Sequence, residues 1–373
     1  MRFFVFLVVI VLTTTGCRTT RKDVAVTRMD FQSEERTNVV PANVSNTNTQ
    51  GTIKPAGTEL PVKSDSHKTN NVVLPKTNRW VTIDSVAETG WILVYSNEVY
   101  PKRCIISKGN RRLELTEDTQ RCKYEGINVY LGYSPRWENG KCLIYSPDFD
   151  STIKPLMETK PALNGKKPTI VIDPGHGGND PGTISIFNKK PEKEYTLDIA
   201  RRLAVLLQAQ GWNVILTRTN DARIELTSRA AFSQNSNVDA FVSIHLNYFD
   251  KSVNVQGLET YCLTPNGTAS TLARGYADNV TTNYMNNKFD SENVALAAEI
   301  HKSLIEKLRP VDRGVRRARF MAVLQNQNCP AVLVEVCFLS SPNEAALIDR
   351  SEYRQEVAMA IADGLKNFYN RGN

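Results

Sequence analysis

The stretch Ile170-Val-Ile-Asp-Pro-Gly-His-Gly-Gly-Asn-Asp-Pro-Gly182 carries the strongest signal of fold and site in this chain. An apolar run typical of a buried strand ends in an acid and a Pro-Gly bend, and a histidine and two glycines follow at once. A second histidine ends a similar apolar run in Val242-Ser-Ile-His-Leu-Asn247. Each run is expected to deliver its histidine, His176 or His245, to the rim of a sheet.

Strand-like and helix-like patterns alternate over residues 167–370. The strand-like stretches are residues 169–173, 213–217, 239–245, 258–263, 320–324 and 331–336, and the helix-like stretches are 194–210, 225–235, 292–308 and 351–369. This alternation predicts an α/β fold, a three-layer domain with a twisted, mostly parallel central sheet flanked by helices. Ligand-binding groups are then expected at the carboxyl ends of the strands, where His176, His245 and Glu335 fall.

The N-terminus, residues 1–17, is predicted to direct export. Arg2 precedes an apolar run, residues 3–12, which is shorter than the roughly 20 residues of a membrane span and typical of a signal peptide. Thr14-Thr-Gly-Cys17 resembles a bacterial lipobox, in which the cysteine is lipidated. The alternative is that Cys17 lies at or near an ordinary cleavage site. We expect an exported protein of the periplasm or cell envelope, and an outer-membrane-anchored lipoprotein where Cys17 carries lipid.

Two segments lie between the export signal and the α/β domain. Residues 18–78 are rich in Thr, Asn, Lys, Pro and Val and show no persistent apolar period, which is typical of a disordered tether. Residues 79–160 contain many aromatic residues, short strand-like runs and the turn Asn139-Gly140, and they predict a small, mostly β domain. Its aromatic side chains either bind sugars or, as is more common, form its core.

Composition narrows the class of protein. A chain of 373 residues, 41 % of them hydrophobic, is ample for a sizeable core and accessory regions. The net charge of +7 is spread along the chain, so no nucleic-acid binding is expected.

Apart from Cys17, six cysteines remain, either as disulfides or as buried free thiols. Cys329 and Cys337 bracket a strand-like run that separates them by roughly 25 Å, too far to pair.

Four side chains indicate a catalytic metal site. Zinc in an enzyme needs about three ligands of the His, Glu or Asp type and an open position for water. His176 and His245 are the nitrogen donors, and Glu192, just before the first helix, is a carboxylate that can reach the same rim. Glu335 ends the apolar run 331–335, where a carboxylate is costly unless it has a partner or a task.

Each of these residues has a simpler explanation when it is taken alone. His176 could be a turn residue and His245 a satisfied histidine at a strand end. Glu192 could be a charge favoured at a helix N-terminus, and Glu335 a member of a buried ion pair. Their occurrence together at matched strand or helix ends favours the metal site. By contrast His301 has no such context and is expected on a solvated helix face.

Several blocks between residues 168 and 369 occur in a distinctive order and spacing. They include Ile172-Asp-Pro-Gly-His176, Glu192-Lys-Glu-Tyr195, Ser243-Ile-His-Leu-Asn247 and Pro330-Ala-Val-Leu-Val-Glu335. On these blocks the chain resembles the zinc-dependent N-acetylmuramoyl-L-alanine amidases, in the branch with a carboxypeptidase-like α/β fold.

The resemblance implies a set of roles and a reaction. One Zn²⁺ ion would be held by His176, Glu192 and His245, with Glu335 as the catalytic acid/base and Asn247 as a substrate-binding residue. The substrate would be peptidoglycan, cleaved at the amide between N-acetylmuramic acid and L-alanine of the stem peptides in cell-wall turnover or separation. Zinc would lower the pKa of its water and polarise the carbonyl, and Glu335 would move the proton.

Two features bear on regulation. Cys337 stands where the family usually has glycine. It is either simply packed, or it is a thiol near zinc that makes the site sensitive to oxidants or metals. The stretch 262–290 is long and polar, and it is either a lid or regulatory insertion over the cleft, or a disordered loop. A protein activator would be the partner of an enzyme held inactive in this way.

Two alternative functions are kept open. The first is a catalytically idle wall-binding protein with the same fold, which the complete set of two histidines and two acids opposes. The second is a zinc hydrolase of another peptide-like substrate, which the resemblance opposes but the zinc chemistry alone does not.

Overall fold

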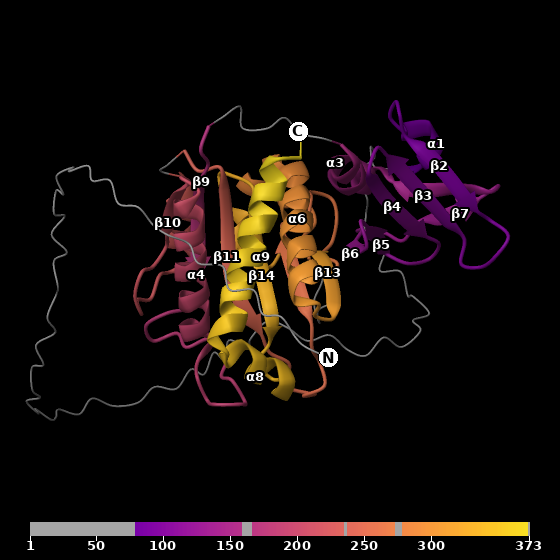
Figure 1. Cartoon of the computed structure of the whole chain (residues 1–373). Helices are drawn as coiled ribbons and strands as arrows, with labels where there is room; N and C mark the ends of the chain where they lie inside the picture. Colours follow the sequence, from indigo (N-terminus) through magenta and orange to yellow (C-terminus); the bar gives the residue numbers. More distant parts are fainter. Residues whose placement is uncertain (1–78, 159–165, 235–236, 273–277, 372–373) are drawn as a thin grey trace, which may run out of the picture. The chain divides into compact units, whose positions relative to one another are not determined.

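The computed structural model describes residues 79–158, 166–234, 237–272 and 278–371 (Figure 1). The predicted signal peptide, Cys17 and the tether lie outside the described residues. Six strands make up one end of an 11-stranded sheet, in the order β10–β9–β11–β14–β12–β13 with β10 at the edge. Their bounds are β9 (Thr169–Pro174), β10 (Asn213–Leu216), β11 (Ala240–Asn247), β12 (Leu258–Cys262), β13 (Asp312–Arg317) and β14 (Ala331–Phe338). Neighbouring strands in this group are parallel except β12 and β14, which confirms the mostly parallel sheet.

Helices cover both faces of these strands, as a three-layer fold requires. The first face carries α4 (Glu192–Ala209), α6 (Asp290–Leu308) and α9 (Ser351–Tyr369), and α9 contacts both of the others (Figure 1). Along β9, Ile170 and Ile172 belong to the core beneath these helices, whereas Val171 belongs to a second core on the other face. There α5 (Leu226–Gln234) contacts α7 (Ala322–Gln325).

The remaining helices are short. A 3-10 turn, η2 (Met285–Phe289), precedes α6, and α8 (Pro342–Asp349) follows β14. Within the described residues, no helix is both long and apolar enough to cross a membrane.

Residues 80–157 form the β-rich region expected upstream. Their strands are β1 (Trp80–Thr82), β2 (Ile92–Ser96), β3 (Arg103–Lys108), β4 (Arg111–Thr116), β5 (Arg121–Tyr124), β6 (Ile127–Tyr130), β7 (Arg136–Glu138) and β8 (Lys141–Tyr145), with short helical turns α1 (Ile83–Val86), α2 (Ser146–Asp148), η1 (Phe149–Ile153) and α3 (Lys154–Met157). Asn139 and Gly140 both have positive φ between β7 and β8, which confirms the predicted hairpin. Strands β2 to β6 continue the large sheet, because β6 pairs with β13 at Val129 and Val315.

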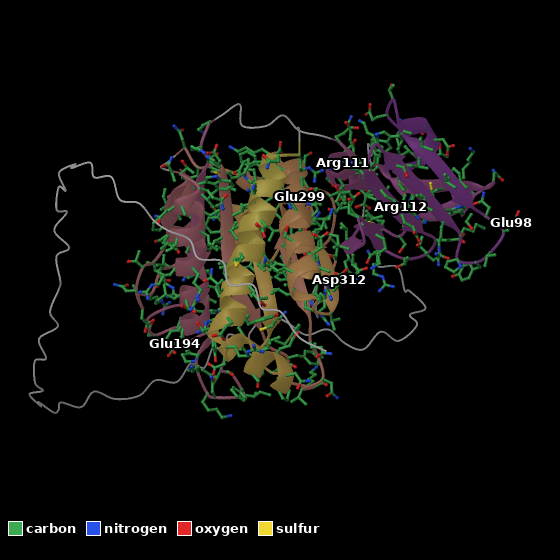
Figure 2. All side chains as sticks on the ribbon, viewed as in Figure 1. Glu98, Arg111, Arg112, Glu194, Glu299 and Asp312 are labelled. Carbon is green, nitrogen blue, oxygen red and sulfur yellow. The ribbon has the colours of Figure 1, made fainter. Side chains whose placement is uncertain are left out.

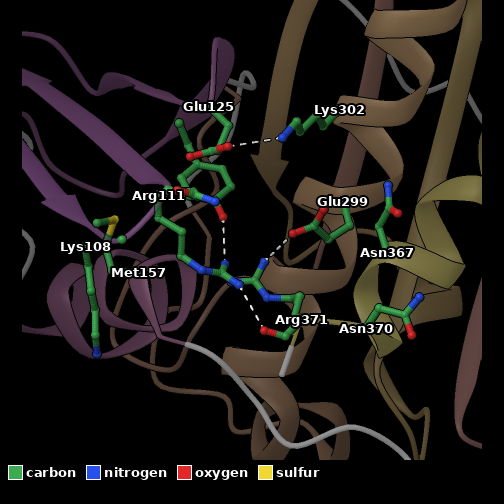
Figure 3. A pocket seen from close by; sticks show the side chains of 12 residues that line it. Lys108, Arg111, Glu125, Met157, Glu299, Lys302, Asn367, Asn370 and Arg371 are labelled. Carbon is green, nitrogen blue, oxygen red and sulfur yellow. Dashed lines mark hydrogen bonds and ion pairs between the residues drawn. The ribbon is translucent and has the colours of Figure 1, made fainter. Parts of the chain in front are cut away.

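Charged side chains surround a cavity of about 630 Å³ where the β-rich region meets α6 and the end of α9 (Figure 3). Arg371 forms an ion pair with Glu299 of α6 at 2.7 Å, and Lys302 pairs with Glu125 at 3.1 Å. Arg111 of β4 donates to the backbone oxygen of Arg371 at 3.3 Å, and Figure 2 shows Arg111 and Glu299 at this junction. These contacts attach the β-rich region to the helical layer.

Two expectations about secondary structure and burial are wrong. Residues 320–324 do not form a strand, because α7 begins at Ala322, and the strand that pairs with β12 is β13. His301 does not lie on a solvated face, because its side chain is fully buried. Its Nε2 lies 3.0 Å from Asp312 Oδ1 and its Nδ1 lies 3.0 Å from Thr260 Oγ1. A residue whose partners lie on another element cannot be placed from the helical pattern alone.

Replacing Gly364 by alanine is expected to destabilise the protein. A Cβ atom there would lie 2.5 Å from Ile300 Cα and 2.9 Å from Glu299 O, because α9 and α6 approach closely at this point. Overpacking of this kind costs about 1–3 kcal/mol, more than the roughly 1 kcal/mol that alanine gains in helix propensity. Urea unfolding measures the change, with exposed Lys366→Ala on the same helix as control. A Gly364→Ala variant as stable as the wild type would contradict this close packing.

Candidate metal centre

His176 lies on a tight turn directly after β9. Its φ is +61°, and Gly177 and Gly178 also have positive φ values of 127° and 60°. The left-handed conformation is uncommon for a residue with a side chain and is readily adopted by glycine. The run of glycines therefore lets the chain reverse at once and hold the imidazole at the carboxyl edge of the sheet.

Two other glycines leave room for the side chains that meet at this edge. A Cβ atom at Gly175 would lie 2.3 Å from the His245 ring. A Cβ atom at Gly182 would lie 2.6 Å from both His176 Cδ2 and Glu192 Oε2. Any side chain at these two positions would displace the groups that the site brings together.

The structure brings His176, Glu192 and His245 together. Glu192 is the first residue of α4, rather than a residue before the helix, and only 1 % of it is exposed. Its Oε2 lies 3.1 Å from His176 Nε2, and its Oε1 lies 3.0 Å from His245 Nδ1. The potential ligand atoms of the three residues all lie within 4.8 Å of one another. Two imidazole nitrogens and a carboxylate are the donor set expected for catalytic zinc, so the residues present fit the ion.

The same contacts set the charges of the metal-free site. Burial lowers the pKa of His176, but hydrogen bonds and charge interactions with Glu192 and Asp180 outweigh it and raise that pKa to about 9. Burial raises the pKa of Glu192, but the hydrogen bonds with His176 and His245 hold it well below its usual range. Asp180 lies 2.9 Å from His176 Nδ1, the position of a carboxylate that orients a metal-binding histidine.

Glu335 lies beside this group on β14, in register with His245 on the neighbouring strand β11. Its Oε2 is buried and has no hydrogen-bond partner in the structure. Burial, together with the negative charges of Glu192 and Glu259, raises the pKa of Glu335 well above its usual value. A buried carboxyl oxygen without a partner is costly, and it is expected where a ligand or water completes the site.

Asn247 lies at the end of β11, and 7 % of it is exposed. Its Nδ2 donates to Glu259 Oε2 at 3.1 Å, and its Oδ1 accepts from the backbone N–H of Tyr248. Glu259 also accepts hydrogen bonds from Arg313 and Tyr261. The side chain of Asn247 thus belongs to a network next to Glu335, and its role in binding substrate stays a prediction.

Neither Cys337 nor the strand end from which the stretch 262–290 leaves supports a regulatory role at the site. Cys337 is buried in the hydrophobic core, and burial raises the pKa of its thiol, which is the opposite of a reactive thiolate. β12 runs antiparallel to β14, with Glu259 opposite Glu335 and Cys262 opposite Val332. The chain after Cys262 therefore leaves at the opposite end of the strands from Glu335, which does not favour a lid formed by the described part of this stretch.

The six cysteines that the structure describes are all buried free thiols.

Sequence reasoning missed Glu259 and Asp173 as parts of the surroundings of the site. Asp173 stands inside the motif that ends β9 and accepts hydrogen bonds from Thr217 and Ser243. Because Asp173 stands inside this motif, three residues before His176, the sequence alone could have indicated that it supports the site.

Comparisons with known proteins agree with this geometry. Residues 170–367, just over half of the chain, match the family described as N-acetylmuramoyl-L-alanine amidase. The chain is 33 % identical over 250 residues to the N-acetylmuramoyl-L-alanine amidase AmiC of Neisseria meningitidis, a match that covers 62 % of this chain and 59 % of that protein. It is 30 % identical over 232 residues to the amidase AmiA of Escherichia coli, covering 57 % of this chain and 79 % of that protein.

The chain also matches solved structures. An N-acetylmuramoyl-L-alanine amidase from Clostridium difficile aligns with a TM-score of 0.45 and 32 % identity, and the alignment covers 55 % of this chain and 97 % of that chain.

Zinc binding at neutral pH is expected to release about one proton, because metal ligands must be deprotonated. In the metal-free chain, His176 is protonated below its raised pKa of about 9. Release should therefore be near its maximum at neutral pH and fall as the pH approaches 9. Calorimetric titration with zinc in buffers of different ionisation enthalpy measures the proton number. Binding without proton release at neutral pH would contradict a protonated His176 in the metal-free protein.

Proposed function

The chain belongs to the N-acetylmuramoyl-L-alanine amidase family, and we propose that it hydrolyses the amide between N-acetylmuramic acid and L-alanine in peptidoglycan. The observation that carries this proposal is the convergence of His176, Glu192 and His245 beside the partnerless oxygen of Glu335. This arrangement has the ligands of a catalytic zinc and a carboxyl group for proton transfer, which amide hydrolysis requires.

His176, Glu192 and His245 would hold one zinc ion. When bound, such an ion supplies a Lewis acid that polarises the amide carbonyl and acidifies water. Glu335 takes the proton of the attacking water on Oε2 and delivers it to the amide nitrogen as the C–N bond breaks. Its burial and its acidic neighbours favour the protonated state of Glu335. This suits the carboxyl group to delivering the proton to the amide nitrogen. Asp180, 2.9 Å from Nδ1, holds the His176 ring in place.

Export to the cell wall is part of the proposal. Residues 1–17 would act as a signal peptide, with lipid on Cys17, and residues 18–78 would give the enzyme reach from the membrane into peptidoglycan. This places the enzyme in the periplasm or cell envelope. Metabolic labelling with a palmitate analogue tests the anchor, since a Cys17→Ala variant should lose the label.

The complete metal-binding set disfavours an idle wall-binding protein. Mass spectrometry of purified peptidoglycan after incubation with the protein separates the alternatives. Release of stem peptides that begin with L-alanine, lost with chelator and restored by zinc, supports the amidase. Zinc binding without release points to another peptide-like substrate or to a required protein activator. Absence of both zinc and release favours the idle protein.

Glu335→Gln is expected to lose activity while it retains zinc. The amide keeps the shape of the side chain but cannot transfer the proton, and loss of a general acid/base costs about 100- to 10,000-fold in rate. His245→Ala should instead lose both zinc and activity, because it removes a ligand. Product release and bound zinc are measured on the same preparations. Wild-type rates in Glu335→Gln would exclude Glu335 as the acid/base.

A further inference from the structure

Two buried arginines, Arg218 and Arg229, lie against the turn that carries His176. They are 3 % and 4 % exposed. Arg218 follows β10, and Arg229 is part of α5. Neither side chain is among the three potential metal ligands, and neither takes part in the proton transfer described above.

The guanidinium of Arg218 joins the two chain segments that supply metal ligands. On the His176 side, it donates to Pro174 O at 3.1 Å and to Gly175 O at 2.8 Å. On the Glu192 side, it donates to Lys193 O at 2.9 Å and to Thr196 Oγ1 at 3.1 Å. These acceptors stand one or two residues before His176 and one or four residues after Glu192, so one side chain fixes the spacing of both ligands.

Arg229 completes the support of the same turn. It donates to Pro174 O at 2.9 Å and to His176 O at 2.8 Å, and it forms a buried ion pair with Asp173 at 2.6 Å. The two arginines together therefore take up the carbonyl oxygens of three successive residues, 174 to 176.

The turn has a conformation that needs such support. A left-handed φ at a residue other than glycine costs on the order of 1 kcal/mol and persists where the surroundings determine it. The absence of a side chain at Gly177 makes room for Arg218, because a Cβ atom there would lie 2.9 Å from Arg218 Cδ. The glycine and the arginine thus form one packed unit beneath His176.

We propose that Arg218 is a positioning residue of the metal centre, which presets the distance between His176 and Glu192 before zinc binds. The inference rests on the proposed function in one respect, that this site binds zinc. It predicts that zinc affinity and coordination geometry depend on Arg218 although it does not touch the ion. One atom, Nη2, donates to Gly175 O, Lys193 O and Thr196 Oγ1, while Nε donates to Pro174 O. A lysine at 218 ends one bond short of Nη2, and its single nitrogen cannot replace both donors.

The chain offers a matched control in Arg317. It is 2 % exposed and donates to the carbonyl oxygens of Leu263 and Ser151, away from the three potential metal ligands. Arg317→Lys therefore reproduces the loss of a buried, carbonyl-bound guanidinium without touching the His176 turn. A purely structural role for Arg218 predicts that the two lysine variants behave alike.

The test compares the wild type, Arg218→Lys and Arg317→Lys in the full-length protein. Zinc affinity is measured by competition with a chromophoric chelator, coordination by the visible spectrum of the cobalt(II)-loaded protein, and stability by thermal unfolding without metal. Arg218→Lys should bind zinc about 10- to 100-fold more weakly and shift the cobalt bands, as loss of an outer-shell partner does. Arg317→Lys should keep the affinity and spectrum of the wild type.

A second variant keeps the inference testable if Arg218→Lys does not fold. Thr196→Val removes one acceptor of Arg218 and also a hydroxyl that donates to Gly175 O at 2.9 Å. It should weaken zinc binding in the same direction, by a smaller factor. Unchanged affinity and spectrum in the folded variants, or equal losses in Arg317→Lys, would overturn the inference. A wild type that binds neither zinc nor cobalt would overturn the proposed function, and the inference with it.

Discussion

The carboxylate of Glu192 is the contact on which the rest of the site depends. It is 1 % exposed, yet its two oxygens lie 3.1 Å and 3.0 Å from nitrogens of His176 and His245. A carboxylate buried this deeply requires well-placed partners, because the cost of removing it from water is otherwise not recovered. β9, α4 and β11 must therefore end at one point, and glycine at 175 and 182 makes that approach possible.

The apolar strands and the edge at which their histidines meet could be predicted from local patterns. β9, β11 and β14 have continuous apolar runs, and parallel strands bring their carboxyl ends together. β13 could not be predicted in this way, because Asp312-Arg-Gly-Val-Arg-Arg317 is mostly charged. Arg316 and Arg317 of this strand are buried because they have partners distant in the sequence. Arg316 forms an ion pair with Glu259, and Arg317 donates to Leu263 O. His301 escaped prediction for the same reason, since its partners lie on β12 and β13.

The β-rich region upstream of the matched family region contributes to the surroundings of the site. Tyr130 of β6 lies under the guanidinium of Arg316, 4.1 Å from its ring centre, in a cation–π contact. Arg316 in turn lies 3.2 Å from Glu259, which is the cross-strand neighbour of Glu335. The charges around Glu335 therefore depend on a residue outside the region shared with the amidase family. The upstream strands therefore do more than form a separate module: through Tyr130 they contribute to the charged surroundings of Glu335.

The most direct test of the central claim is a crystal structure of the zinc-loaded protein with anomalous diffraction measured on both sides of the zinc absorption edge. The account predicts one strong anomalous peak, bound by His176, Glu192 and His245, with its open side toward Glu335. A peak bound by cysteine thiolates or by residues elsewhere, or a peak with a further protein ligand closing the open position, would contradict it.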